Sequence, residues 1–279
     1  MQRNCKMKTA LITGSTDGIG KATALKLLKD GWAVVINGRS SAKCEATIHE
    51  LKQKSGSNSV TAFTADLSNL AQVNSAIDKF IETHTKLDLL MLNANVIAND
   101  RIITSEGNEQ NFALGYLSRV LMVRKLEKIL ENTTNSQILS VIGMDTQPLD
   151  FNDPTIERNF TGRKGLARWQ WAMNLFTTEY NKTSKVPLNL YMPGLVKTKI
   201  LANEPQPMRA FVKIMNYIVG LTPEQSAGNV LVVINDIVSK QKKGTCYSWK
   251  KERGLPKIKT SEGDNVKLLN LTNEILQKY

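Results

Sequence analysis

Short apolar runs of strand length alternate with helical stretches along the chain, and this alternation constrains the fold more than any other feature. Strands buried on both faces are typically near-continuous apolar runs, and their alternation with helices predicts a parallel sheet covered on both sides. We therefore predict an α/β fold, a doubly wound parallel sheet of about seven strands with helices on both faces. The predicted strands are Thr9–Thr13, Ala33–Asn37, Val60–Ala65, Leu87–Leu92, Gln137–Ile142, Leu188–Met192 and Thr245–Trp249.

Helical periodicity occupies the intervals between these strands. No linker, composition break or internal repeat divides the chain, so residues 1–279 are predicted to form a single domain. In such sheets ligands bind at the carboxyl ends of the strands, where the winding reverses. The predicted helices are Ile19–Lys29, Ser41–Lys54, Leu70–Thr83, Glu109–Leu130, Leu166–Asn181, Phe211–Val219, Pro223–Val238 and Leu268–Gln277.

A glycine-rich loop follows the first predicted strand and opens the first helix. Gly14 allows a sharp turn, Gly18 allows the backbone to approach a pyrophosphate, and Gly20 lets the helix pack closely on the sheet. The helix N-terminus then offers N–H groups and a positive dipole end to phosphates. A glycine-rich turn without a ligand is the alternative, but the position between strand and helix favours a dinucleotide-binding domain of the Rossmann type.

The charge and cysteine content exclude several other classes. The net charge of +12 comes from scattered Lys and Arg without a nucleic-acid motif, so no nucleic-acid partner is expected. Three dispersed cysteines and two histidines predict neither a disulfide framework nor a metal site. No apolar stretch is long enough to span a membrane. We expect a cytoplasmic protein.

Short motifs follow three of the later strands: Asp66-Leu67 after the third, Asn93-Ala94-Asn95 after the fourth, and Pro193-Gly194 with Val196 and Thr198 after the sixth. The spacing Gly-x-x-x-Gly-x-Gly, together with these motifs, resembles the short-chain dehydrogenase/reductase family over roughly residues 7–250, and residues 222–227 resemble its retinol-dehydrogenase-like and fungal branches. The resemblance implies that the cofactor is held by Gly14, Ser15, Thr16, Asp17, Gly18, Ile19, Gly20, Arg39, Ser40, Asp66, Leu67, Asn93, Ala94, Asn95, Pro193, Gly194, Val196 and Thr198.

The end of the second strand indicates which dinucleotide is bound. NAD enzymes place an acidic residue here for the ribose 2′-hydroxyl, and none stands between Ala33 and Ser41. Arg39 can donate two parallel hydrogen bonds to a 2′-phosphate, and Ser40 can add a hydroxyl donor. A solvated loop arginine is the alternative. We predict NADP(H).

The family's catalytic residues are the point where the resemblance breaks. It uses a Tyr as acid/base, a Lys four residues on, a Ser after the fifth strand and an Asn in the preceding long helix. At these positions we find Leu166, Gln170, Gly143 and Gly115. An alternative register places Phe160 and Lys164 at the Tyr and Lys positions. Neither register supplies a phenol.

Other polar groups near motif positions are candidates for chemistry. Asp145 follows the fifth strand, and Tyr116 and Tyr191 are phenols close to motifs. With Lys164 and Gln170 they form our catalytic candidates, although a solvated carboxylate and two packed phenols are the simpler interpretations. Ser140 should point away from the expected serine position because side chains alternate along a strand.

Three functions remain open at this point. The first is an NADP(H)-dependent oxidoreductase with a non-standard proton donor, acting on a small lipophilic carbonyl or alcohol. The second is an enzyme of the same fold without net redox chemistry, such as a cyclase, isomerase or lyase. The third is a catalytically silent binding protein. By resemblance we expect a substrate lid at about residues 199–221, a C-terminal tail from about 250, and a homodimer or homotetramer formed through the two long helices.

Overall fold

A single sheet organises the structure, a computed structural model that describes residues 7–96, 98, 100–197 and 220–279. The strand order is β3-β2-β1-β4-β5-β6-β7-β8, and β1 to β7 run parallel while β8 is antiparallel to β7. The strands are β1 (Thr9–Ile12), β2 (Ala33–Gly38), β3 (Val60–Thr64), β4 (Leu89–Leu92), β5 (Gln137–Val141), β6 (Leu188–Met192), β7 (Cys246–Ser248) and β8 (Lys251–Glu252).

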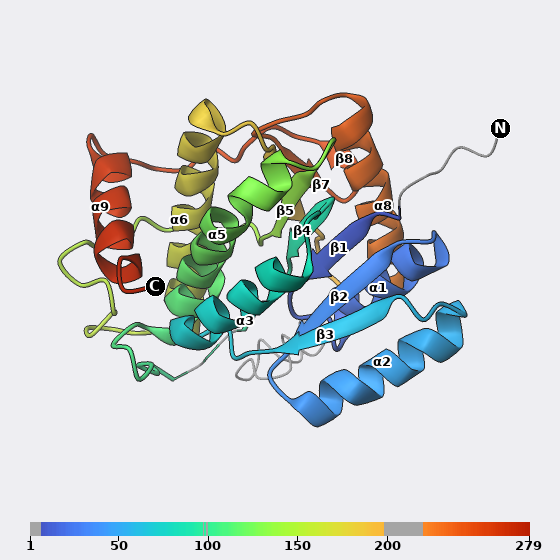
Figure 1. The fold of residues 1–279 in the computed structure, drawn as a ribbon. Helices are drawn as coiled ribbons and strands as arrows, with labels where there is room; N and C mark the ends of the chain where they lie inside the picture. The colour runs from blue at the N-terminus through green and yellow to red at the C-terminus, as the bar shows by residue number, and fades with distance from the viewer. Residues whose placement is uncertain (1–6, 97, 99, 198–219) are drawn as a thin grey trace.

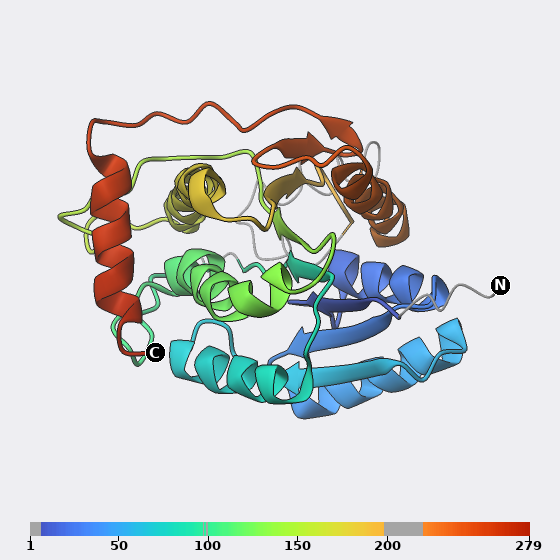
Figure 2. The same ribbon diagram turned by 45° about the horizontal axis from the view of Figure 1, so that its top comes forward.

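Helices cover both faces of this sheet (Figures 1 and 2). One face packs against α1, α2 and α8, and the other against α3, α5 and α6. The helices are α1 (Gly18–Lys29), α2 (Ser41–Ser55), α3 (Leu70–Thr83), α4 (Gln110–Phe112), the π-helix η1 (Ala113–Leu117), α5 (Ser118–Glu131), α6 (Gly162–Thr183), α8 (Pro223–Ser239) and α9 (Asp264–Leu276).

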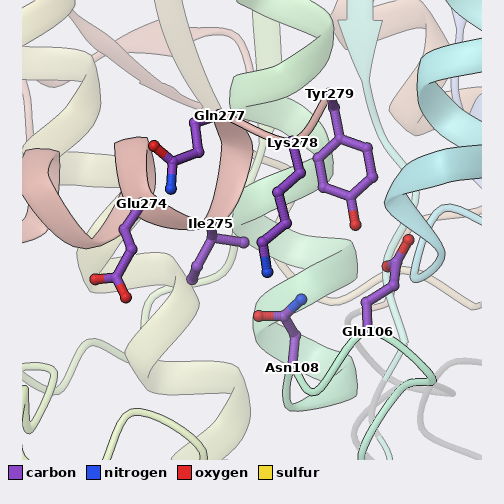
Figure 3. Close-up of a pocket in the computed structure, with 7 residues that line it drawn as sticks. All are labelled: Glu106, Asn108, Glu274, Ile275, Gln277, Lys278 and Tyr279. Atoms are coloured by element: carbon purple, nitrogen blue, oxygen red, sulfur yellow. The ribbon is translucent and has the colours of Figure 1, made fainter.

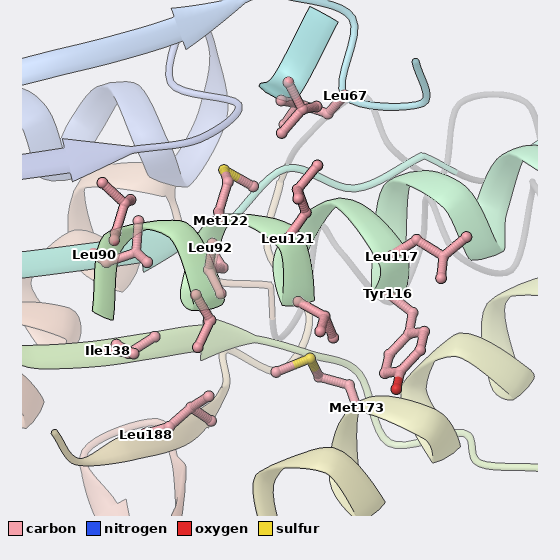
Figure 4. Close-up of a cluster of buried hydrophobic side chains, with 14 of the residues drawn as sticks. Leu67, Leu90, Leu92, Tyr116, Leu117, Leu121, Met122, Ile138, Met173 and Leu188 are labelled. Carbon is pink, nitrogen blue, oxygen red and sulfur yellow. The ribbon is translucent and has the colours of Figure 1, made fainter. Parts of the chain in front are cut away.

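Each face of the sheet buries its own apolar cluster. Figure 4 shows the larger one, in which Leu90 and Ile138 of the sheet meet Met122 of α5 and Met173 of α6. All four side chains are fully buried. Burial of this kind stabilises a fold by about 25 cal/mol for each Å² of apolar surface, and it fixes the positions of the strand ends.

The winding direction reverses between β1 and β4. The chain proceeds from β1 to β2 and β3 on one side, and from β4 to β7 on the other. A crevice outside the carboxyl ends of β1 and β4 is the place where this topology puts ligands. The predicted doubly wound α/β fold is therefore confirmed.

Several predicted boundaries were wrong. The long helix Glu109–Leu130 is interrupted by η1, and the helix expected from Leu166 begins already at Gly162. The sheet gains β8, because the chain turns back after Trp249 to pair with β7. The predicted helix Phe211–Val219, Thr198 and the expected lid up to residue 219 lie outside the described residues.

The C-terminal helix α9 packs beside α6 and η1. Tyr116 of η1 shares a hydrogen bond of 2.8 Å with Thr272 of α9, and Trp171 of α6 donates to the carbonyl of Lys259 at 2.7 Å. Leu268 of α9 is buried in the same cluster. Part of the surface of the long helices, through which we expected an oligomer, is therefore covered by the chain itself.

Candidate functional site

The glycine loop between β1 and α1 is fastened to the segment after β4. Asn93 Nδ2 donates to the carbonyls of Thr13 and Gly14, both at 3.0 Å, and Thr13 Oγ1 accepts from the backbone of Asn93 and Ala94. Gly14 has φ +60°, and a Cβ there would lie 2.7 Å from Ala94 Cα. Only glycine lets the loop approach this closely, so Asn93 and Ala94 shape the loop.

A second set of hydrogen bonds ties the loop to β2. Ser15 Oγ donates to the Ile12 carbonyl at 2.6 Å and accepts from Asn37 N at 2.9 Å. Asn37 Oδ1 also accepts from Gly14 N at 3.3 Å. Ser15 is fully buried, so its side chain holds the loop in place and is not free for a ligand.

Helix α1 begins directly above this loop. Asp17 caps the helix by accepting from Gly18 N at 2.8 Å, and Gly18 has φ +56°. A Cβ on Gly20 would lie 2.6 Å from the Gly14 carbonyl oxygen. At Gly14 and Gly20 the loop thus leaves no room for a Cβ. This tight turn, the glycine cradle, has a helix N-terminus at its rim and fits a pyrophosphate group. Thr16 and Ile19 belong to the same loop and are half-buried.

Arg39 lies next to this cradle. A Cβ on the preceding Gly38 would lie 2.6 Å from Thr16 Cγ2, so the end of β2 contacts the loop directly. Arg39 is exposed, and no hydrogen bond or ion pair ties it to another described residue. Ser40 caps α2, accepting from Lys43 N at 3.4 Å. A free guanidinium beside a phosphate cradle is available to a further anionic group.

The remaining predicted cofactor residues lie at the ends of β3, β4 and β6. Asp66 is half-buried and accepts from the backbone and hydroxyl of Ser68, at 2.9 and 2.8 Å. Gly194, with φ +72°, lies against the half-exposed indole of Trp249, a neighbour that sequence reasoning missed. Leu67 and Val196 are buried, and Asn95 and Pro193 are half-buried.

Contacts across α6 test the register of the catalytic positions. A Cβ on Gly143 would lie 2.7 Å from Gln170 Oε1, and one on Gly115 would lie 2.5 Å from Trp169 Cγ. Gly143 and Gly115, the positions predicted for the Ser and the Asn, therefore contact the turn of α6 that carries Gln170, the position predicted for the Lys. In the alternative register, Phe160 precedes the N-cap Thr161. It therefore does not share a helix face with Lys164, and the contacts of Gly143 and Gly115 with α6 favour the first register.

Gln170 is the unusual side chain of this region. It is fully buried, and its Oε1 and Nε2 both lack a hydrogen-bond partner. A buried amide without partners costs on the order of 1–3 kcal/mol for each unsatisfied group. An unpaired amide at the position predicted for the Lys is compatible with a polar group bound beside it.

The two candidate phenols belong to the packing. Tyr116 is buried against α9, and burial raises the pKa of its phenol above the usual range. Tyr191 lies on the opposite face of the sheet, where its hydroxyl donates to the Ser226 carbonyl at 3.5 Å, and burial again raises its pKa. Neither phenol faces the strand ends as a proton donor would have to.

Asp145 and Lys164 line one hollow of about 320 Å³ beside the start of α6. Asp145 is exposed and pairs with Arg163 at 3.0 Å, and Lys164 Nζ donates to the Asn159 carbonyl at 2.7 Å. This hollow borders the catalytic positions through Ala167. A second cavity of about 150 Å³, between α9 and the loop of Glu106 and Asn108, includes none of the predicted site residues (Figure 3).

Sequence reasoning also missed Arg119. It is 1% exposed and donates to Ser140 Oγ and to the carbonyls of Val141 and Ala94, each at 2.7 Å. Ser140 Oγ is fully buried and accepts from this guanidinium. The only sequence signal was a single charge within the apolar stretch that begins α5.

Fold, glycine cradle and strand-end motifs together define a dinucleotide-binding α/β protein. A family model for short chain dehydrogenases matches residues 8–151. The chain belongs to the short chain dehydrogenase family. In the described part of the chain, no helix is long and apolar enough to cross a membrane, and no three His, Cys, Asp or Glu side chains are grouped as metal ligands.

Among curated relatives, human retinol dehydrogenase 13 is 29% identical over 199 residues, which is 69% of this chain and 60% of the relative. Human polyprenol dehydrogenase is 24% identical over 231 residues, covering 79% and 70%. The chain thus spans about 60% of the length of the first of these relatives.

Solved structures confirm the fold. An alcohol dehydrogenase of the archaeon Thermococcus sibiricus, complexed with 5-hydroxy-NADP, superposes with a TM-score of 0.67 at 21% identity, covering 91% of this chain and all of that one. An NADH-dependent reductase of alginate metabolism gives 0.64 at 23%, covering 87% and 95%. The choice between the two dinucleotides therefore depends on this chain's own residues.

Proposed function

We propose that this protein is an NADP(H)-dependent oxidoreductase that acts on a small lipophilic alcohol or carbonyl compound with a non-standard proton donor. The observation that carries the proposal is the cradle at the switch point with Arg39 beside it. A bound dinucleotide would supply the hydride, and the chain would bind and orient it.

Residues of the chain fit the parts of such a ligand. The loop from Gly14 to Gly20 would hold the pyrophosphate at the N-terminus of α1. The guanidinium of Arg39 would pair with the 2′-phosphate, and Gln170 would bind ribose hydroxyls through its unpartnered amide. The names of the retinol and polyprenol dehydrogenases support a lipophilic alcohol as substrate.

The proposal differs from the family's usual mechanism in its proton donor. Leu166 cannot transfer a proton, and Gly115 and Gly143 bring no side chain. Asp145 and Lys164, which line the hollow beside these positions, are the titratable candidates. We propose that a water held near Gln170 or one of these groups protonates the product oxygen. Because a positioned acid typically contributes about 10²–10⁴-fold, turnover should be slow.

Titration calorimetry with NADPH and NADH tests the cofactor. The wild-type protein should bind NADPH more tightly, and Arg39→Ala should remove on the order of 1–3 kcal/mol of that preference, the size of a charged hydrogen bond. Arg253, exposed on the loop after β8, provides a matched control: Arg253→Ala should leave the preference unchanged. Equal or tighter binding of NADH by the wild type would refute the role of Arg39.

Loss of the usual acid also favours a second candidate, an enzyme of this fold without net redox chemistry or a silent binding protein. Consumption of NADPH with a panel of aldehydes and ketones separates these functions, because only the oxidoreductase oxidises the cofactor. A cytoplasmic location and a homodimer or homotetramer also stay predictions. Fractionation and sedimentation measurements test them.

A further inference from the structure

Arg119 is a buried cation without a counter-ion among the described residues. Its hydrogen-bond acceptors are a hydroxyl and two backbone carbonyls, and its guanidinium lies 4.6 Å from the centre of the Trp169 ring. Burial lowers its pKa to about 9, so it remains protonated at neutral pH. A buried charge that no opposite charge balances is costly, and such a cost is typically tolerated where the charge serves a ligand.

The other buried arginine of this region shows the contrast. Arg168 donates to the Asp153 carbonyl at 2.8 Å, and the carboxylates of Asp153, Asp150 and Glu109 lie close enough to raise its pKa against the effect of burial. Its charge is therefore balanced within the protein. Among the residues that the structure describes, no carboxylate balances the charge of Arg119 in this way.

The position of Arg119 connects it with the proposed site. Ala94 follows β4 by two residues, and Val141 is the last residue of β5. The guanidinium therefore lies at the carboxyl ends of β4 and β5, and β4 is one of the two strands that border the crevice. The guanidinium is stacked on Trp169, the neighbour of Gln170 in the chain. The positive charge that the family pattern places at position 170 is absent there, while Arg119 of α5 brings one to the ring of the neighbouring Trp169.

We propose that Arg119 is a positioning residue that replaces this lysine electrostatically and makes the site discriminate between the reduced and the oxidised dinucleotide. The oxidised nicotinamide ring carries a positive charge and the reduced ring is neutral. A fixed cation at the carboxyl ends of β4 and β5 therefore disfavours NADP⁺ relative to NADPH, and it favours a developing negative charge on a substrate oxygen. The inference rests on the proposed dinucleotide site.

Calorimetric binding of NADPH, NADP⁺ and 2′,5′-ADP tests this inference at fixed ionic strength. The wild type should bind NADPH about tenfold more tightly than NADP⁺, a difference of about 1.4 kcal/mol. Arg119→Gln should bring the ratio close to one, and Arg119→Lys should retain most of it. Binding of 2′,5′-ADP, which lacks the nicotinamide, should be the same in all three proteins. Arg168→Gln, which removes a balanced charge, should leave the ratio unchanged.

A second variant keeps the test decisive if Arg119→Gln does not fold. Ser140→Asp would place a carboxylate next to the guanidinium, since Ser140 Oγ is 2.7 Å from Arg119 Nη1. It should lower the ratio towards one and raise resistance to urea. A ratio that is unchanged in a folded Arg119→Gln or Ser140→Asp protein overturns the inference alone. Failure of the wild type to bind any of the three nucleotides overturns the proposed function itself.

Discussion

Gly115, the position predicted for the catalytic Asn, packs against the Trp169 indole. A substitution at Gly115 tests this contact. A Cβ at this position would lie 2.5 Å from Trp169 Cγ. The indole is fully buried and has the Arg119 guanidinium over its ring, so it has little freedom to move away. We therefore predict that Gly115→Ala destabilises the protein, although alanine is the better helix former.

Two opposing effects set the change in the free energy of unfolding of Gly115→Ala. Inserting a methyl group into a packed core typically costs about 1–3 kcal/mol, and replacing glycine by alanine in a helix contributes up to about 1 kcal/mol in the other direction. The net loss should be about 1–2 kcal/mol. For a domain of this size it should lower the melting temperature by about 2–8 °C.

Urea and thermal unfolding followed by circular dichroism measure this loss. Gly228→Ala on α8 is the matched control, because its nearest neighbour would be Lys26 Cε at 4.0 Å. This variant should be as stable as the wild type or more so. In a double-mutant cycle with Trp169→Leu, the two substitutions should couple by at least about 0.5 kcal/mol. A Gly115→Ala protein as stable as the Gly228→Ala protein would show that the indole does not fill this position.

Three further outcomes are expected. Tyr116→Phe should lose about 1 kcal/mol of stability with its hydrogen bond to Thr272 and leave the pH profile of any activity unchanged; a shifted profile would return this phenol to the list of proton donors. Leu166→Tyr combined with Gln170→Lys should raise NADPH-dependent reduction of a simple aldehyde by up to about 10²–10⁴-fold, and no gain in a folded, cofactor-binding variant would contradict the register. Burial raises the pKa of the Cys246 thiol to about 12, so a thiol reagent at pH 8 should label it only after unfolding, and labelling of the native protein would show that β7 is open.

Much of the fold could be predicted from the sequence because its signals are local. The apolar runs gave the parallel strands, and the glycine spacing of the first loop needs only Gly14, Gly18 and Gly20 in order between a strand and a helix. The structure brings the end of β2 to this loop through Gly38, so Arg39 lies beside the loop, and its pairing with a 2′-phosphate stays a prediction.

The features that could not be predicted depend on long-range contacts. The interruption of the long helix at η1 accompanies the close approach of Gly115 and Trp169, which are distant in sequence. In the sequence, Arg119 resembles an ordinary solvated charge on a helix. Its acceptors, the carbonyls of Ala94 and Val141, come from distant parts of the chain and are known only from the structure. Tyr116 lies close to a motif in sequence, but α9 packs over it.

The pairing between Val196 and Leu221 has a consequence for engineering. Lys197 N donates to the Leu221 carbonyl and Leu221 N to the Leu195 carbonyl, both at 2.9 Å. The chain is thus closed at a stem on either side of residues 198–219. Since the entropy of closing a loop grows slowly with its length, this stem is a natural grafting point. We predict that a segment of another length or sequence can be exchanged at this stem without altering the sheet or the glycine cradle.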